Sequence, residues 1–379
     1  MIQLIKTTTR QLVEMLVIII FSTAAIFGQM ENGLSEELTT TANQLLQKQI
    51  SEKVFTGVVA GISIDGHPTW INAKGYSDKK AEKPMTTQTI IRTASIAKPM
   101  TAVAVMQLWE QGLIDLEAPI QQYIPDFPKK KEGEITTRHL LSHTSGIAGY
   151  VSGKEAETQK DYPTLADAMD VFKDRDLLFT PGTAFSYTTY GYVVLGRIIE
   201  SVSGMNYEAY MIQNILEKVG MENTGIEEYQ TIYSNKTKNY HRNRKGKMAL
   251  AKKANNLSNR IPGGGFYSCV EDLLKFGEAI INNELIKEST LQVLLETPSL
   301  KDHGNPYAHG WLLYGGPDSP TQTFGHGGEQ TGASTQLMIT PITKKVVVVM
   351  GNTSGSYKEA LILSVDLIKA SKEETKLGE

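Results

Sequence analysis

Short apolar runs that are typical of β-strands lie near both ends of the chain. Residues 57–64 and 69–73 flank an Asp65-Gly66 turn, which predicts a β-hairpin. Two further strand-like runs cover residues 334–340 and 345–350. The second of these runs holds five consecutive apolar residues, which is typical of a central strand buried on both faces.

Helical patterns occupy the middle of the chain and the outer sides of the strand-like segments. A helix capped by Ser35 is expected over residues 35–50, and an apolar-faced helix is expected over residues 357–370. Residues 99 to about 260 are helix-rich and irregular, and they include an apolar run from Met100 to Trp109 that belongs in a core. The chain thus leaves a sheet and returns to it, which predicts an α+β fold.

Composition indicates a globular protein without covalent cross-links. The formal net charge of −3 over 379 residues gives no reason to expect a nucleic-acid partner. The single cysteine, Cys269, excludes an intramolecular disulfide. Lys6 and Arg10 precede an apolar stretch from Leu16 to Phe27, so residues 1–28 are interpreted as a signal peptide of an exported protein, periplasmic or secreted. The alternative is an uncleaved N-terminal anchor, the one case in which a membrane is an expected partner.

A serine and a lysine three residues apart open the apolar run. Ser95 and Lys98 share one face of a helical turn, where a hydroxyl and an amine can form a nucleophile and its base. The positive potential of a helix N-terminus favours an oxyanion there, and Gly112 is expected to end the helix. Ser77 and Lys80 have the same spacing, but no apolar helix follows them, so that pair is interpreted as a solvated turn.

Four further segments strengthen this pair. Residues 181–204 hold a Pro-Gly turn, Tyr187 and then a helical pattern, and residues 324–332 read FGHGGEQTG. Glycines in the latter segment would let a backbone edge approach a substrate closely. The other two segments are LLSHTSGI at 140–147 and PGGGFYS at 262–268.

Taken in their order along the chain, the segments resemble the serine β-lactamase-like superfamily, and the most similar branch is the class C β-lactamases with related esterases and peptidases. The resemblance runs from about residue 35 to about residue 370. It implies an antiparallel sheet flanked by terminal helices, with an inserted helix-rich domain and a cleft between the two. The expected organisation is one hydrolase domain over residues 29–379, with a sheet part at about 29–98 and 262–379 and a helical part at about 99–261.

The same resemblance implies the roles of individual residues. Ser95 and Lys98 match Ser-x-x-Lys, and Tyr187 matches the tyrosine of Tyr-x-Asn. Thr189 stands where the asparagine would touch the lysine and the substrate's acyl-side amide. His326 and Gly328 match the His-x-Gly form of the third motif. The implied catalytic residues are therefore Ser95, Lys98 and Tyr187, the implied substrate-binding residues are His326, Gly328 and Thr189, and neither a cofactor nor a metal is expected.

The implied reaction is two-step acyl transfer from a small-molecule or peptide substrate through a serine ester. Either Lys98 or Tyr187 takes the proton from Ser95, and the sequence does not choose between them. The amide of Ser95 and one near Gly328 or Glu329 would stabilise the oxyanion. Because His326 replaces a fixed positive charge, we expect esters or uncharged amides to be preferred over carboxylate-bearing β-lactams.

Two alternatives to this function remain open. One is a β-lactamase or D,D-carboxypeptidase acting on cell-wall peptides or their mimics. The other is a non-catalytic relative that binds such ligands. The sequence does not indicate an oligomeric state.

Other reactive residues are interpreted as structural. Cys269 is expected to be a small core residue, and His143 is expected to order its loop through hydrogen bonds rather than to bind a metal. The basic stretch from Lys236 to Lys253 is expected to be a solvated surface loop rather than a site for an anionic polymer.

Overall fold

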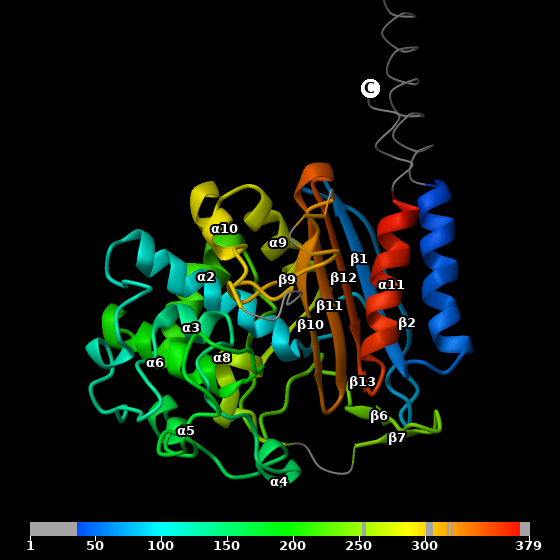
Figure 1. Ribbon diagram of the computed structural model, residues 1–379. Coiled ribbons are helices and arrows are strands. Elements are labelled where there is room, and N and C mark those ends of the chain that lie inside the picture. The colour runs from blue at the N-terminus through cyan, green and yellow to red at the C-terminus, as the bar shows by residue number, and fades with distance from the viewer. Residues whose placement is uncertain (1–35, 252–254, 301–305, 317, 320, 372–379) are drawn as a thin grey trace, which may run out of the picture.

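The computed structural model describes residues 36–251, 255–300, 306–316, 318–319 and 321–371. Its main sheet has seven antiparallel strands in the order β3-β2-β1-β12-β11-β10-β9 (Figure 1). The first strand of the chain therefore pairs with a strand near its end, as the sequence predicts. The strands are β1 Gly57–Ile64, β2 His67–Asp78, β3 Lys83–Pro84, β9 Leu312–Leu313, β10 Phe324–Gln330, β11 Ala333–Thr340 and β12 Lys345–Gly351.

The predicted hairpin is confirmed, although its second strand is longer than expected. Asp65 and Gly66 both have positive φ angles, 53° and 80°, as a two-residue hairpin turn with the right-handed strand twist requires. The second strand, β2, continues to Asp78. Ser77 lies in this extension and is 2% exposed, and its hydroxyl donates to the carbonyl of Pro84 in β3 at 2.9 Å. The interpretation of Ser77 as part of a solvated turn was therefore wrong, because the turn begins after it.

Two terminal helices cover one face of the sheet (Figure 1). A helix over residues 36–51 lies beside α11, Tyr357–Ala370, which has the predicted bounds. Leu46 and Leu363 of these helices belong to one buried cluster with Val347 and Val349 of β12. The predicted cap, Ser35, lies outside the described residues.

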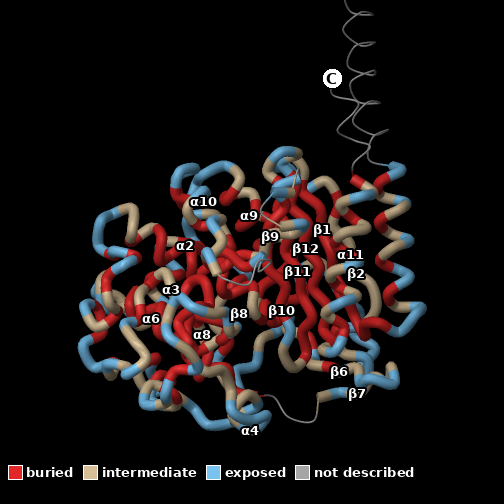
Figure 2. The backbone as a smooth tube through the Cα atoms, in the orientation of Figure 1, coloured by how far each residue is buried: buried red, intermediate tan, exposed pale blue. Residues whose placement is uncertain are grey.

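The opposite face of the sheet packs against the helical part of the molecule. Helix α9, Val270–Ile281, contacts β12 and β1. Val346, Val348 and Met350 point into this second cluster, whereas the intervening valines of β12 point into the first. The five apolar residues of β12 are thus buried on both faces, as predicted, and Figure 2 shows this layer as continuously buried.

The helical part is built around α2, Ala97–Glu110, whose residues from Ala97 to Met106 are all buried. Gly112 follows it with a φ of 71°, which confirms the predicted left-handed stop. A short 3-10 helix, η1, precedes α2 at Ala94–Ile96. The remaining helices are α3 Thr137–Leu141, α4 Gly153–Ala156, α5 Leu165–Met169, α6 Tyr190–Ser203, α7 Tyr207–Met211, α8 Ile261–Gly264 and α10 Glu288–Leu294, with short 3-10 turns at Ile120–Gln122, Glu217–Val219, Ser258–Arg260 and Pro341–Thr343 and a π-helical turn at Ile212–Leu216.

The fold also contains two small three-stranded sheets. One of them shows that the prediction of a solvated loop over residues 236–253 was incomplete. The stretch from Lys236 to Lys253 contains a hairpin, β6 and β7, that pairs with β13 beside α11. Arg242 of β6 donates to Glu359 of α11 at 2.7 Å, so the stretch is docked on the sheet part rather than being only a solvated loop. The strands of the two small sheets are β4 Ile91–Arg92, β5 Gly225–Ile226, β6 Tyr240–Arg242, β7 Met248–Leu250, β8 Phe266–Ser268 and β13 Thr353–Ser354.

Within the described ranges, no helix has both the length and the apolarity needed to cross a bilayer. The signal peptide predicted for residues 1–28 lies outside the described residues, so export stays a prediction.

Candidate active site

The six predicted site residues come from three places in the chain and meet between the sheet and the helical part. Ser95 lies in η1 and Lys98 in the first turn of α2. Tyr187 and Thr189 immediately precede α6, and Thr189 is its N-cap residue. The third place is β10, which contributes His326 and Gly328 and packs against η1 (Figure 1).

Ser95 is presented by a strained stretch of backbone. Ala94, directly before it, has a φ of 49°, a left-handed conformation that residues with a Cβ rarely adopt. Thr93 holds this stretch on both sides, because its amide donates to Phe266 in β8 at 2.9 Å and its carbonyl accepts from the Thr335 hydroxyl of β11 at 2.9 Å. The Ser95 amide stands in the first turn of η1, where backbone N–H groups have no intrahelical acceptor.

Lys98 is completely buried and surrounded by neutral acceptors. Its Nζ lies 3.1 Å from Ser95 Oγ, 3.5 Å from Thr189 Oγ1 and 2.8 Å from the carbonyl oxygen of Gly263. Burial, together with the positive charge of Arg260, lowers the pKa of Lys98 well below its ordinary value of 10.5. The amine is thus adjacent to the candidate nucleophile, and burial makes it easier to deprotonate than an ordinary lysine.

Tyr187 lies over the same lysine with its hydroxyl at Ser95. Lys98 Nζ is 4.8 Å from the centroid of the tyrosine ring. The side chain as a whole is 42% exposed, and its hydroxyl forms a hydrogen bond with Ser95. Burial raises the pKa of Tyr187 well above its usual range, and the hydrogen bond with Ser95 opposes that rise only in part. The phenol is therefore protonated at neutral pH.

His326 is buried and uncharged. Burial, reinforced by Lys98, lowers its pKa from 6.5 to about 3. Its Nδ1 lies 2.5 Å from the carbonyl oxygen of Gly327, which only accepts hydrogen bonds, so this nitrogen carries the proton. Its Nε2 then accepts from the hydroxyl of Tyr307 at 3.1 Å. The imidazole is thus oriented by protein groups on both ring nitrogens.

Gly328 allows β10 to approach η1. A Cβ at this position would lie 2.6 Å from Thr335 Oγ1, 2.7 Å from the carbonyl oxygen of Thr93 and 2.8 Å from the Cβ of Ala94. Two of these groups belong to the segment that presents Ser95. The absent side chain therefore sets the separation between the strand and the candidate nucleophile.

We expect Gly328→Ala to lower activity more than stability. The added methyl must push β10 away from η1, which misplaces the backbone donors around Ser95, and overpacking of this kind costs about 1–3 kcal/mol in folding free energy. The rate of covalent labelling by a fluorophosphonate and the melting temperature should be measured together. Gly153→Ala is the control, because a Cβ there meets nothing within 4 Å. Wild-type labelling by Gly328→Ala would contradict this account of the strand.

His143 orders its loop through a hydrogen bond, as predicted. It also has a second structural role that the sequence did not reveal. Its Nδ1 accepts from the amide of Thr188 at 3.3 Å, which fixes the loop before α6. Its ring centroid lies 4.3 Å from that of Tyr187 and 4.7 Å from that of Tyr307. His143 thus supports the ring that reaches Ser95, a contact between segments about 45 residues apart that spacing alone does not indicate.

Other candidate chemistries find no support in the described part of the chain. Cys269 is buried, and burial raises its pKa to about 12, so its thiol stays protonated, as expected for a core residue. No group of three or more histidine, cysteine or acidic side chains among the described residues is arranged to hold a metal ion.

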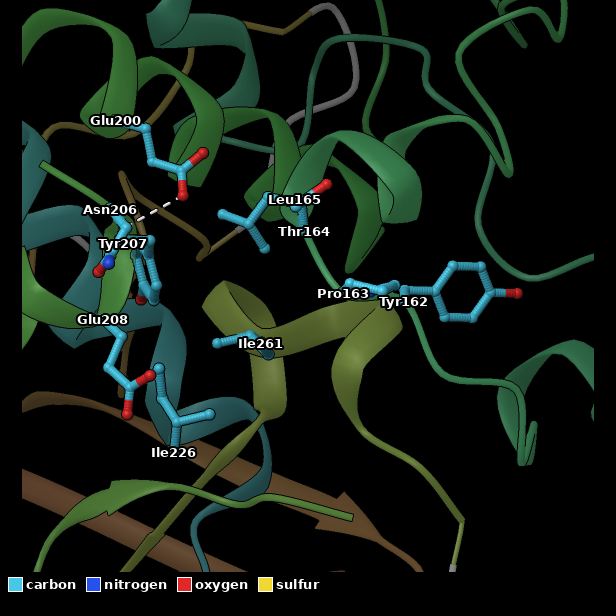
Figure 3. A pocket seen from close by; sticks show the side chains of 10 residues that line it. All are labelled: Tyr162, Pro163, Thr164, Leu165, Glu200, Asn206, Tyr207, Glu208, Ile226 and Ile261. Carbon is cyan, nitrogen blue, oxygen red and sulfur yellow. Dashed lines mark hydrogen bonds between the residues drawn. The ribbon is translucent and has the colours of Figure 1, made fainter. Parts of the chain in front are cut away.

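A separate cavity of about 330 Å³ adjoins α8 on the helical part (Figure 3). Glu200 and Glu208 flank Tyr207 on one side of it, and the Tyr162 ring points away. The Tyr207 hydroxyl shares a hydrogen bond with Thr101 at 2.7 Å, one turn along α2 from Lys98. None of the six predicted site residues lines this cavity, so we place the candidate active site at Ser95. The lining residues are Tyr162, Pro163, Thr164, Leu165, Glu200, Asn206, Tyr207, Glu208, Ile226 and Ile261.

Comparison with known proteins agrees with the motifs. The family model described as Beta-lactamase matches residues 42–368. The human serine beta-lactamase-like protein LACTB, mitochondrial, is 29% identical in a match that covers 79% of this chain and 72% of that protein. Penicillin-binding protein 4* of Bacillus subtilis is 25% identical, with 86% and 75% covered. The structure of D-amino acid amidase from Ochrobactrum anthropi SV3 superposes with a TM-score of 0.79 over 90% of this chain and 100% of that chain, at 22% identity, which supports the fold.

Proposed function

The chain belongs to the β-lactamase family, and we propose that it is a serine hydrolase that cleaves esters or uncharged amides through an acyl-enzyme on Ser95. The observation that carries the proposal is the 3.1 Å separation between Ser95 Oγ and a fully buried lysine amine whose pKa is lowered. A hydroxyl beside an unprotonated amine is the arrangement that a nucleophile and its general base require.

The pKa directions favour Lys98 over Tyr187 as the base in the first step. A neutral amine has two N–H donors and one lone pair. The Gly263 carbonyl and the Thr189 hydroxyl can take the two donors, which leaves the lone pair facing the Ser95 hydroxyl. Tyr187, by contrast, has a raised pKa and would have to lose its proton first.

Tyr187 is then placed to move the proton onward. As Ser95 Oγ bonds to the substrate carbonyl carbon, its proton passes to Lys98. The phenol of Tyr187, hydrogen-bonded with Ser95, donates its own proton to the departing oxygen or nitrogen and recovers one from Lys98. Water attacks the acyl-enzyme by the reverse relay, so the protons balance over both steps.

The tetrahedral intermediate carries its negative charge on the former carbonyl oxygen of the substrate. Stabilising this oxyanion requires hydrogen-bond donors that point at that oxygen. The amide of Ser95 in η1 is one candidate, and the amide of Gly328 or Glu329 in β10 is the other, because β10 packs directly on η1. Such backbone donors typically contribute about 3 kcal/mol each to transition-state stabilisation.

The proposed substrate preference follows from the absence of a positive charge on His326, the histidine of the His-x-Gly motif. Penicillins, cephalosporins and D-Ala-D-Ala peptides carry a carboxylate beside the scissile bond. His326, with a pKa of about 3, has no positive charge to offer that group at neutral pH, and Thr189 supplies a hydroxyl in place of an amide. Substrates without this carboxylate are therefore favoured.

We expect wild-type protein to have a higher kcat/KM for a short-chain nitrophenyl ester than for a chromogenic cephalosporin. His326→Lys should shift the ratio toward the cephalosporin by about 10-fold, because a charged hydrogen bond contributes roughly 1.5–3 kcal/mol. His326→Gln is the neutral control and should leave the preference for the ester in place. Melting temperatures of both variants show whether the buried substitution is tolerated.

The opposite wild-type preference would overturn this substrate assignment and support a β-lactamase or D,D-carboxypeptidase. The similarity to penicillin-binding protein 4* is the observation that keeps this alternative in view. A protein that binds β-lactams without being labelled at Ser95 would instead support the non-catalytic alternative.

A further inference from the structure

A further buried cation lies near the site, and no ion pair neutralises it among the residues that the structure describes. Arg260 is 6% exposed. Its Nε donates to Asn259 Oδ1 at 2.9 Å, its Nη2 donates to the carbonyl of Ala156, and its guanidinium stacks 4.7 Å from the centroid of the Tyr150 ring. No carboxylate forms an ion pair with it within the described part of the chain. Buried arginine is uncommon unless it is paired.

Two other buried cations near Ser95 show how unusual this is. Arg92 in β4 is 1% exposed, and Glu227 neutralises it through two hydrogen bonds of 2.9 and 2.7 Å. Burial lowers the pKa of Lys98, so this amine can shed its charge by releasing a proton. An arginine cannot do so, because its guanidinium stays charged at every ordinary pH. Arg260 therefore retains an uncompensated positive charge.

The surroundings of Arg260 face the site and add an unused donor. Gly264 of α8 has no side chain, and a Cβ there would lie 3.8 Å from Arg260 Cδ, 3.7 Å from Gln330 Oε1 and 3.8 Å from the carbonyl oxygen of Ala94. The Nε2 of Gln330 is buried without a hydrogen-bond partner among the described residues. Arg260 Cδ and Gln330 Oε1 thus lie near the same point beside Gly264, next to the Ser95 segment, and both side chains carry N–H groups.

The nearby acids are already engaged elsewhere. Glu155 accepts from Arg175 at 3.1 Å and also from the Tyr190 hydroxyl. Glu157 accepts from the Thr331 hydroxyl at 2.7 Å. Neither contacts the guanidinium, so the charge of Arg260 stays available to a ligand.

The position of Arg260 relative to the reacting bond is set by its neighbours. Tyr150, on which it stacks, forms a side-chain contact with Thr189, the residue that stands at the acyl-side position. Gln330 is four residues from His326 along β10, which is roughly 13 Å in an extended strand. The donors therefore lie on the acyl side and far from His326.

We propose that Arg260, with Gln330, binds a carboxylate at the far end of the substrate's acyl group, so that the preferred substrates are esters or amides of dicarboxylic acids. This inference rests on the proposed function and refines it, because it distinguishes a carboxylate beside the leaving group, which His326 does not attract, from one at the remote end of the acyl chain. The anion supplies the partner that the buried guanidinium lacks.

The test compares two nitrophenyl esters with the same leaving group, the half-ester of glutaric acid and the uncharged butyrate. Wild-type protein is expected to favour the glutarate ester in kcat/KM, and Arg260→Gln should lower the glutarate-to-butyrate ratio by about 10-fold to 100-fold. The ratio isolates recognition of the anion, because any change that Arg260 causes in the pKa of Lys98 affects both esters equally. Arg260→Lys should recover part of the ratio.

The matched control is Arg242→Gln, which removes a positive charge paired with Glu359 and should leave the ratio unchanged. An unchanged ratio in Arg260→Gln, with turnover still dependent on Ser95, overturns this inference and leaves the proposed function intact. If neither ester is hydrolysed, the proposed function fails, and calorimetric titration with glutarate still decides the inference. Binding to wild type but not to Arg260→Gln supports the carboxylate site, whereas equal or absent binding excludes it.

Discussion

Ser95→Ala is expected to abolish covalent labelling by a fluorophosphonate and to reduce ester hydrolysis by about a million-fold, to near the background rate. The Ser95 hydroxyl lies 3.1 Å from the amine of Lys98, whose pKa is lowered, and the adjacent Thr189 hydroxyl lies farther away at 3.5 Å. Intact-mass analysis of the labelled protein measures the result directly.

Ser77→Ala is the matched control, because Ser77 has the same spacing to a lysine. Its hydroxyl is committed to the backbone of β3, so the variant should keep full labelling and lose at most some stability. Equal labelling of wild type and Ser95→Ala would refute the assignment of the nucleophile.

Lys98→Ala and Tyr187→Phe should each lower kcat by about 100-fold to 10,000-fold, the usual contribution of a proton-transfer group. Acylation should be affected in both variants, so single-turnover release of nitrophenol is the appropriate measurement. A variant with near-normal kcat and only a raised KM would show that the substituted residue binds substrate and takes no part in the proton path.

The two residues should differ in their effect on pH dependence. The rate of acylation requires neutral Lys98, so it should rise with pH through the lowered pKa of this residue and then level off. Tyr187→Phe keeps the base and should keep this limb. Lys98→Ala removes the base and should remove it. His326, with a pKa of about 3, adds no limb near neutral pH.

The parts of the fold that the sequence predicts are those in which the local pattern of apolar residues reports both the element and its burial. Helix α11 has its predicted bounds because its apolar positions repeat at the helical period. Strands β1 and β12 were predicted from short, nearly continuous apolar runs, and both strands are buried on both faces. Ser95 and Lys98 were found because both belong to one helical turn.

The parts that the sequence did not predict depend on contacts across long separations. The hairpin of β6 and β7 is stabilised by β13, more than 100 residues away, and its charged composition resembles a loop. Ser77 was misread because the carbonyls that bury its hydroxyl belong to the next strand. Arg260 shows no local signal, since its lack of an ion pair is a property of the folded surroundings.

The left-handed backbone of Ala94 ties the chemistry of the site to the integrity of distant parts of the molecule. Such a conformation costs roughly 1–3 kcal/mol and persists only while its surroundings enforce it. Those surroundings are β8 and β11, which hold Thr93 from opposite sides. Substitutions that loosen either strand would let Thr93 and Ala94 relax to an ordinary backbone conformation. Ser95 would then turn away from Lys98 while most of the fold remained intact. Some substitutions far from the substrate should therefore produce proteins that still fold and bind ligands but no longer react.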